Sequence, residues 1–419
     1  MKLFLKKVRI LDPESSFHGQ TVNLEIKNGI ITGIGTDLEP SSGKIQTIEQ
    51  ENLTVSQGWF DSSVSLGEPG YEERETISNG LQVAAYNGFT DIAVNPNSNP
   101  ITDTQADINF LKNKAEKHAV SLHPIGALTR NASGSELAEL YDMAQAGAIA
   151  FGDYQKSISN PNLLKLALLY TQGFNGLVLS FPQDNQMAGK GQVHEHEEST
   201  RLGLKGIPVI AESLQIARDL HILRYTGGRL HIPTISTAKS VQLLRQGKAD
   251  GLDVSCSVSI AHLLFTDAEL RTFDTHFKLL PPLRTKEDQQ ALIEGLKDGT
   301  IDMVTSDHNP LDLELKQKEF DHAAFGTTAQ EAVLGVLNRL VSEKRMIQLL
   351  TSARKRFTGI THPIAQGTQA CLTLFEMRSK YNISQEDLFA KSKNSAFLGT
   401  EVKGRVIGIV VNNHYVSRS

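Results

Sequence analysis

Two histidines and several acidic residues stand close together in one short stretch, Val193-His-Glu-His-Glu-Glu198. On a β-strand, His194 and His196 would point to the same face, where two imidazoles could bind a metal ion. The acidic residues are also typical of the first turn of a solvated helix, where they complement the helix dipole. We expect a loop that leads into a helix, and a metal site at His194 and His196 is the alternative.

Other candidate residues stand at or near the carboxyl ends of strand-like segments. Asp153 follows segment 148–151, His231 lies within segment 229–232, and Asp307 follows segment 302–305. Sites of parallel α/β barrels form at the carboxyl ends of the strands. Asp153 and Asp307 could serve such a site or could be structural carboxylates satisfied by hydrogen bonds. We expect His231 to be a packed or hydrogen-bonded core residue.

The composition of the chain excludes several classes of protein. With 419 residues it can bury a large core, and its net charge of −5 without a basic stripe disfavours nucleic-acid binding. Cys256 and Cys371 are too far apart for a Cys-x-x-Cys motif, which fits a reducing cytoplasm. No segment reaches the roughly 18 apolar residues of a membrane span. We therefore expect a cytoplasmic protein that binds neither nucleic acid nor membranes.

The pattern between residues 56 and 362 predicts an α/β fold, a TIM-type (β/α)8 barrel. Strand-like segments alternate there with amphipathic segments such as 105–118, 135–146 and 286–297. A doubly wound sheet is the competing architecture, because periodicity alone cannot show whether a sheet closes. The predicted strands are 91–94, 121–125, 148–151, 176–180, 208–211, 229–232, 253–258 and 302–305.

Both ends of the chain predict a small β domain. Asn28-Gly29 is a hairpin signal between two alternating segments near the N-terminus, and alternating segments return after residue 363. We expect residues 1–55 and 363–419 to form one β-sandwich beside the barrel of residues 56–362. The predicted strands of this domain are 3–10, 21–26, 30–34, 47–55, 369–375 and 403–415.

The segment Gly58-Trp-Phe-Asp-Ser-Ser-Val-Ser-Leu-Gly-Glu-Pro-Gly70 resembles the first metal-binding segment of the dihydroorotases, D-x-H-x-H-L-R-E-P-G. Asp61 and Glu68-Pro69-Gly70 match its frame. Further motifs follow in the order of the family, so the resemblance covers nearly the whole chain. They are Asn95-Pro-Asn-Ser-Asn-Pro100, Ala150-Phe-Gly-Asp153, His231-Ile-Pro-Thr-Ile-Ser-Thr237, Lys278-Leu-Leu-Pro-Pro-Leu-Arg284, Asp298-Gly-Thr-Ile-Asp-Met-Val-Thr-Ser-Asp-His-Asn-Pro310 and Ser392-Lys-Asn-Ser-Ala-Phe-Leu-Gly399.

The resemblance implies roles for particular residues. In the family a metal-bound hydroxide attacks a cyclic amide, and an aspartate after the last barrel strand moves the proton. By position this catalytic base is Asp307, which would also be a zinc ligand together with Asp153, the bridging ligand, and His231. Asn97 and His308 would bind substrate, although Asn97 could instead brace its turn.

Most metal ligands of the family are absent at the matching positions. Ser63 and Ser65 stand where the family has a histidine pair, and Phe181 and Thr234 replace two further histidines. Neutral hydroxyls are poor zinc ligands, and a catalytic zinc needs about three protein ligands. The substrate-binding positions of the family are occupied here by Gly67, Leu280 and Leu311.

The resemblance thus implies a dihydroorotase-like protein of pyrimidine biosynthesis that is catalytically impaired or inactive and binds no metal. It would act as a structural or regulatory partner of aspartate carbamoyltransferase, and we also expect a homo-oligomer. Two alternatives stay open. The first is an active hydrolase of a cyclic amide with an atypical zinc site. The second is a small-molecule binding protein whose barrel mouth Leu280 and Leu311 make less polar.

Overall fold

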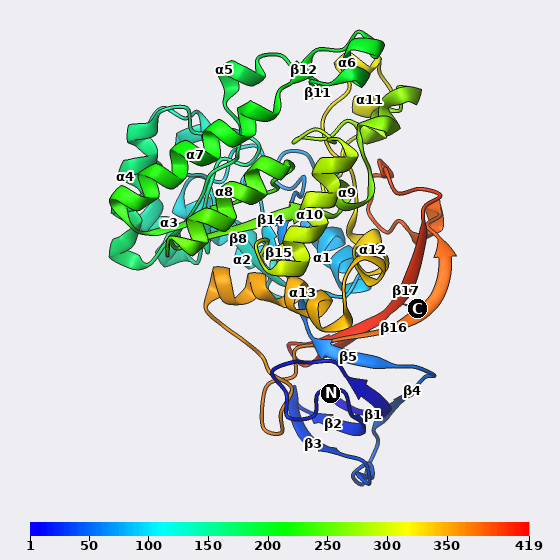
Figure 1. The fold of residues 1–419 in the computed structure, drawn as a ribbon. Helices are drawn as coiled ribbons and strands as arrows, with labels where there is room; N and C mark the ends of the chain where they lie inside the picture. Colours follow the sequence, from blue (N-terminus) through cyan, green and yellow to red (C-terminus); the bar gives the residue numbers. More distant parts are fainter. Residues whose placement is uncertain (419) are drawn as a thin grey trace.

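Eight parallel strands form the central sheet of the computed structural model, which describes residues 1–418 (Figure 1). They lie in the order β15-β14-β13-β10-β9-β8-β7-β6, and Val64 of β6 forms a parallel bridge with His308, just after β15. Sequential order and closure distinguish a barrel from a doubly wound sheet, so the predicted fold class is confirmed. The strands are β6 (Trp59–Val64), β7 (Phe89–Val94), β8 (Ser121–Gly126), β9 (Ala150–Phe151), β10 (Leu177–Leu179), β13 (Arg229–Ile232), β14 (Val254–Ser259) and β15 (Met303–Thr305).

Helices connect the strands and cover the outside of the barrel (Figure 1). Several begin at a threonine whose hydroxyl accepts a backbone N–H of the first turn, as Thr104, Thr237 and Thr285 do for α2, α8 and α10. No helix among the described residues is long and apolar enough to cross a membrane. The larger helices are α1 (Ile77–Tyr86), α2 (Gln105–Ala115), α3 (Leu140–Ala146), α4 (Pro161–Thr171), α7 (Val209–Thr226), α8 (Ala238–Ala249), α10 (Lys286–Asp298), α12 (Val333–Leu340) and α13 (Glu343–Thr358).

One predicted barrel strand is wrong. Residues 208–211 do not form a strand, because helix α7 begins at Val209 with Pro208 as its N-cap residue. A short apolar run does not separate a strand from the buried face of a helix, and proline before a first turn favours the helix. The predicted strand 47–55 is also divided, into β4 (Gln46–Glu49) and β5 (Thr54–Gln57).

A second sheet is built from both ends of the chain, as predicted (Figure 1). Its order is β18-β17-β16-β5-β1-β2-β3, with β4 paired to β1. The two ends meet where β5 pairs antiparallel with β16. The chain passes into the barrel at Gly58, between β5 and β6. The remaining strands are β1 (Lys2–Ile10), β2 (Thr21–Lys27), β3 (Ile30–Gly35), β16 (Leu372–Asn382), β17 (Glu401–Val411) and β18 (His414–Ser417).

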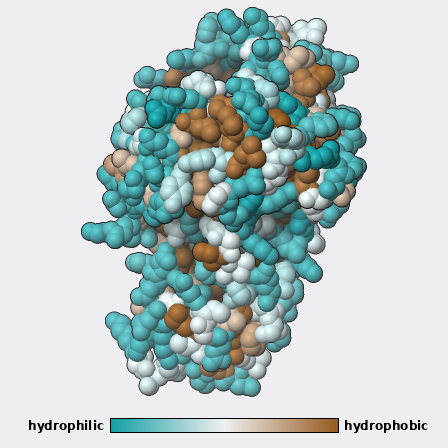
Figure 2. Space-filling view, turned by 90° about the vertical axis from the view of Figure 1, so that its left-hand side faces the viewer, coloured by the Kyte–Doolittle hydropathy of each residue, from teal (hydrophilic) through white to brown (hydrophobic). Residues whose placement is uncertain are grey.

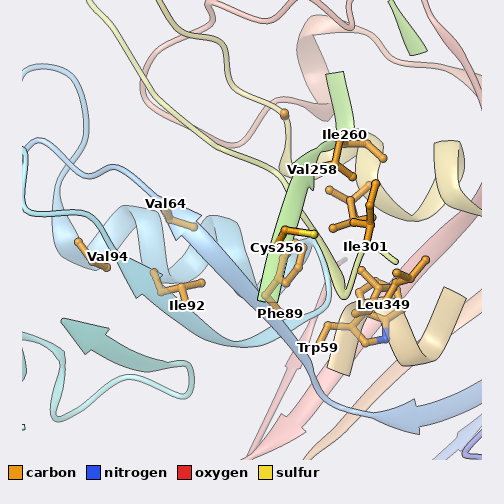
Figure 3. Packing of buried hydrophobic residues seen from close by; sticks show 14 of the residues in the cluster. Trp59, Val64, Phe89, Ile92, Val94, Cys256, Val258, Ile260, Ile301 and Leu349 are labelled. Atoms are coloured by element: carbon orange, nitrogen blue, oxygen red, sulfur yellow. The ribbon is translucent and has the colours of Figure 1, made fainter. Parts of the chain in front are cut away.

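Trp59 joins the sheet domain to the base of the barrel. Its ring centroid lies 6.1 Å from that of Phe89 in β7 and 5.3 Å from that of Phe375 in β16. Figure 3 shows Trp59 among buried side chains that come from the strands and from α13, such as Phe89 and Leu349. Residues of β16 and β17 therefore share an apolar cluster with the barrel at the amino-terminal end of the barrel strands, opposite the candidate site, whereas β1, β2 and β3 pack in a separate cluster.

Candidate functional site at the barrel mouth

The residues singled out in the sequence lie around the carboxyl end of the barrel strands. Ser63 is in β6, and Ser65 follows the end of that strand. Asp153 and Asp307 each stand two residues after a strand, β9 and β15, and His231 lies within β13. Parallel strands of a barrel end at one rim, which brings these side chains to the same mouth.

Hydroxyl groups hold Asp307. Ser63 Oγ donates to Asp307 Oδ1 at 2.8 Å, and Tyr154 Oη donates to the same oxygen at 3.3 Å. Burial raises the pKa of Asp307 to about 6, with the Ser63 hydrogen bond opposing the shift and the Asp61 carboxylate adding to it. A pKa near 6 would suit a general base. The oxygen bound by Ser63 and Tyr154, however, already has two donors.

A network of neutral groups fills the place of the histidine pair. Asn95 Nδ2 donates to Ser63 Oγ at 3.1 Å and lies 3.3 Å from Ser65 Oγ, and Asn97 Nδ2 donates to Ser65 Oγ at 2.9 Å. The Asn97 Oδ1 atom is buried without a partner among the described residues. Asn97 thus braces the rim of the mouth through Ser65, and no charged group stands at positions 63 and 65.

Asp153 is held by Thr129. The backbone N–H of Thr129 donates to Asp153 Oδ1 at 3.0 Å, and the Thr129 hydroxyl donates to Asp153 Oδ2. Burial raises the pKa of Asp153, and the two Thr129 hydrogen bonds oppose this shift. Both carboxylate oxygens therefore have a donor from the protein, which is the arrangement of a structural carboxylate.

His231 is buried between two serines. Its Nδ1 lies 2.9 Å from Ser255 Oγ and its Nε2 lies 3.2 Å from Ser257 Oγ. Burial lowers the pKa of His231 to about 3, so the ring is neutral at physiological pH. A metal ligand needs a ring nitrogen that is free to bind the ion, whereas both nitrogens of His231 have hydroxyl partners.

His308 is part of the frame of the mouth. Its carbonyl oxygen accepts the Ser65 backbone N–H at 2.8 Å, and its Nδ1 accepts the Ala329 backbone N–H at 3.3 Å. Burial lowers its pKa to about 3. His308 is not among the residues that line the cavity at the mouth. Its observed contacts connect the end of β15 to β6 and to the segment before α12.

The cavity at the mouth is small, about 20 Å³. A space of this size is enough for about one water molecule. Phe181 and Leu179 line it, and Phe181 stands where the resemblance implies a histidine. Gln155 closes one side, because its Nε2 donates to the carbonyl oxygen of Leu280 at 3.0 Å. A ring-sized substrate would need this mouth to open.

The residues of the mouth do not fit a catalytic metal ion. Ser63, Ser65, Phe181 and Thr234 offer neither imidazole nor carboxylate, and His231 has both nitrogens engaged. Among residues 1–418, one group of His, Cys, Asp or Glu side chains could hold a metal ion, and it lies outside the mouth. It consists of His194, His196 and Asp267, whose ligand atoms all lie within 4.8 Å of one another. No catalytic step through a metal at the mouth follows from this geometry.

The backbone excludes a side chain at position 67, where the resemblance implies an arginine. A Cβ atom on Gly67 would overlap the carbonyl oxygen of Tyr71 and lie 2.8 Å from that of Glu75. Those two residues also form backbone hydrogen bonds with Gly67. Leu280 packs against the small cluster of Ala188, Ile207 and Ala211, and Leu311 is buried. The substrate-binding positions of the family thus carry apolar or absent side chains.

Several residues at the mouth have strained backbone conformations. Four non-glycine residues that line the cavity have positive φ, namely Tyr154 (34°), Gln155 (30°), Thr234 (48°) and Asp307 (49°). Such conformations cost of order 1–3 kcal/mol each and gather at functional sites. For a β-branched residue such as Thr234 the conformation is a clear outlier. These residues therefore hold the backbone of the mouth in conformations that the surrounding structure must stabilise.

Sequence analysis missed several residues that shape the mouth. Four hydroxyl groups form hydrogen bonds with the three candidate residues. Asp153 is bound by Thr129, Asp307 by Tyr154, and His231 by Ser255 and Ser257. Tyr154 directly follows Asp153, which was a usable signal. Nothing in the sequence pairs Thr129 with Asp153, since the two come from different strand–helix connections.

The fold places the chain in a class. The solved L-hydantoinase (dihydropyrimidinase) from Arthrobacter aurescens has a TM-score of 0.86 at 21% identity and covers 99% of this chain and 96% of its own. A D-hydantoinase (dihydropyrimidinase) from Thermus sp. has a TM-score of 0.83 at 20% identity, over 99% and 95%. These likenesses define the class by its fold, a parallel α/β barrel with an additional sheet domain.

Sequence relatives define the family within that class. The chain is 35% identical to a dihydroorotase of Acetivibrio thermocellus over 99% of both chains. It is 36% identical to a dihydroorotase of Pelotomaculum thermopropionicum over 99% of this chain and 98% of that protein. A family model described as dihydro-orotase-like matches residues 53–240. The chain belongs to the dihydroorotase family.

Proposed function

We propose that this chain is a catalytically inactive member of its family that acts in pyrimidine biosynthesis as a structural or regulatory partner of aspartate carbamoyltransferase. One observation carries the first part. The Asp307 carboxylate, the expected base, is bound by Ser63 and Tyr154 in a mouth whose cavity of about 20 Å³ has no cluster of metal ligands among the described residues.

A turnover assay tests the loss of catalysis. Untagged full-length protein is stripped with a chelator, reloaded with Zn²⁺, Mn²⁺ or Co²⁺, and assayed in both directions with dihydroorotate and N-carbamoyl-aspartate. We expect no turnover above the rate without protein. A curated dihydroorotase relative, prepared in the same way, serves as the positive control. Steady metal-dependent turnover would instead support an active hydrolase with an atypical site.

The surface supports the proposed role as a partner. Large apolar side chains are exposed on α3, α4, α7 and the short helix α5 (Asn185–Ala188), and Figure 2 shows apolar residues gathered on the face that carries the left-hand helices of Figure 1. Exposed apolar patches often mark protein interaction sites. These side chains are Tyr141, Leu166, Leu169, Tyr170, Met187, Ile210 and Leu214.

Sedimentation of a mixture tests the partnership. The chain and the aspartate carbamoyltransferase of the same cell are centrifuged separately and together. We expect a complex that is weakened by Leu166→Asp with Leu169→Asp on α4, because both side chains are about half exposed (45% and 47%). Phe110→Asp on α2, which is 36% exposed, is the matched control. Separate sedimentation of the two unmodified proteins would contradict the proposal.

A further inference from the structure

A second group of metal-binding side chains lies outside the barrel mouth. His194 is in the short strand β11 (Val193–His194), His196 precedes helix α6 (Glu197–Leu202), and Asp267 begins the short 3-10 helix η3 (Asp267–Thr272). The two histidines belong to the connection after β10, and Asp267 belongs to the connection after β14. Figure 1 shows β11 and α6 at the top of the molecule. The group therefore joins two loops beyond the carboxyl end of the barrel.

The three side chains converge on one point. His194 Nδ1 and His196 Nδ1 each lie 3.3 Å from Asp267 Oδ2. The two imidazole rings are stacked, with centroids 5.3 Å apart and planes 3° from parallel. The side chains of His194 and Asp267 are 4% and 10% exposed, whereas that of His196 is 44% exposed. The group is thus buried on one side and reachable from solvent on the other.

The spacing matches that of ligands around a tetrahedral ion. Zinc binds imidazole nitrogen and carboxylate oxygen at about 2.0–2.2 Å, which places neighbouring ligand atoms about 3.3–3.5 Å apart. Both nitrogen–oxygen distances have this value, and all three ligand atoms lie within 4.8 Å of one another. Of the two contacts with Asp267, the His194 contact has hydrogen-bond geometry. His196 Nδ1 lies at the same distance from that oxygen without hydrogen-bond geometry.

The surroundings fix the backbone that carries the group. His194 is held by the pairing of β11 with β12 (Gly206–Ile207), and the Asp267 backbone N–H donates to the Arg284 carbonyl oxygen at 2.9 Å. The Arg284 guanidinium donates to Ile207 O and to Ser236 Oγ. Arg271 pairs with Glu198 at 2.6 Å and so ties α6 to η3. The other oxygen of Glu198 is buried without a partner among the described residues.

We propose that His194, His196 and Asp267 bind a zinc-class divalent ion that clips the two loops together above the barrel. Two imidazoles and one carboxylate suit Zn²⁺ or Co²⁺, and the exposed side leaves room for water as the fourth ligand. The site shares no residue with the mouth, so it does not depend on whether the mouth is active. His194 and His196 supply two ligands of the site, and the third comes from Asp267, which is distant in the sequence.

Metal titration of the full chain tests the site. Untagged protein stripped with a chelator is titrated with Zn²⁺ by calorimetry and with Co²⁺ by visible absorption. We expect saturation at one equivalent, a tetrahedral Co²⁺ spectrum, a higher Tm, and slower hydrogen exchange in segments 193–207 and 265–272. His196→Ala and Asp267→Asn should each weaken binding at least about 100-fold, because losing even a second-shell partner costs 10–100-fold.

Two control variants locate the ion. His221→Ala removes an exposed histidine of α7 and should bind as the unmodified chain does. Asp153→Asn with Asp307→Asn removes the carboxylates of the mouth and should also leave the titration unchanged. Circular dichroism confirms that each variant is folded. His196→Ala is the mildest of the ligand substitutions, because the His196 side chain is 44% exposed. The proposal is overturned by absence of saturable binding, by unchanged binding in folded His196→Ala, or by loss of binding in the mouth variant.

Discussion

Ser63 donates a hydrogen bond to the Asp307 carboxylate, whereas an imidazole at this position would offer a lone pair to a metal ion. Ser65 Oγ accepts a hydrogen bond from Asn97 Nδ2, so its lone pair is used within the protein. His231 keeps the residue type of the family, but Ser255 and Ser257 occupy both of its nitrogens. At the scale of residues, the mouth is a hydrogen-bonded network in which Asp307 is the costly member, because it is buried without a cation.

Replacing Asp307 by asparagine should stabilise the protein above pH 6. The folded-state pKa of about 6 exceeds the ordinary value of 3.8, so the folded chain binds a proton more tightly than the unfolded chain. The stabilising effect of that proton is complete below about pH 4 and is lost as the pH rises through 6. Asp307→Asn removes this loss of stability. Its free energy of unfolding should exceed that of the unmodified chain by about 3 kcal/mol at pH 7.5 and by little at pH 4. Urea unfolding between pH 4 and 8 measures it.

The matched control for this experiment is Asp37→Asn, which changes an exposed carboxylate. It should leave the unfolding free energy nearly unchanged across the same pH range. If Asp307→Asn destabilised the protein at pH 7.5, the carboxylate would instead be balanced by a cation, and the proposed inactive mouth would be untenable.

The segment after β6 shows how the backbone of an element limits which side chains a position can accommodate. Gly67 donates its N–H to the Glu75 carbonyl oxygen at 2.9 Å and accepts the Tyr71 N–H at 2.7 Å. This tight loop leads into α1 and leaves no room for a Cβ atom at position 67. The arginine of the family therefore cannot be restored by one substitution, since the loop backbone would have to move as well.

Gly67→Ala should destabilise the fold. The added methyl group would overlap backbone atoms, and overpacking of this kind costs about 1–3 kcal/mol or more. Gly67→Arg should cost at least as much. Gly173→Ala is the matched control, because a Cβ atom there meets nothing within 4 Å, and it should change stability by less than about 1 kcal/mol. Thermal unfolding of the three variants compares them, and equal Tm values for both alanine variants would show that the loop relaxes freely.

At the scale of the whole molecule, the barrel and the sheet domain are joined at the end opposite the mouth. Trp59 is fully buried between Phe89 of the barrel and Phe375 of the sheet domain, and its Nε1 donates to Ser56 Oγ at 3.0 Å. The core is therefore continuous where β5 passes into β6. Changes at the mouth can accumulate without loss of the fold, because most of the buried apolar area lies elsewhere.

Trp59→Ala should destabilise both parts of the molecule together. Removal of a buried aromatic side chain costs about 3–5 kcal/mol, and here it also leaves the Ser56 hydroxyl without its donor. Urea unfolding followed by hydrogen exchange should show earlier opening of both the barrel strands and strands β5 and β16. Phe110→Ala, at an exposed side chain of α2, should have a small effect. Loss of protection in the sheet domain alone would contradict a shared core.

The sequence by itself determined the alternation of strands and helices, the β segments at both ends and the resemblance to the family, but not the closure of the sheet. The period of apolar residues and the order of motifs can be read along the chain without a structure. The sequence also determined that imidazoles are missing at positions 63, 65, 181 and 234. It failed for segment 208–211, where a short apolar run is compatible with either a strand or a helix.

The tertiary structure alone decided which partners the remaining polar residues have. Thr129 with Asp153, Tyr154 with Asp307, and Asp267 with the two histidines are contacts between separate strand–helix connections. Hydrogen bonding and metal coordination act over a few ångströms in space, and residues far apart in the chain reach that range only when the barrel closes. For this reason the sequence shows which residue types stand at the mouth, while the folded chain shows which partners they have.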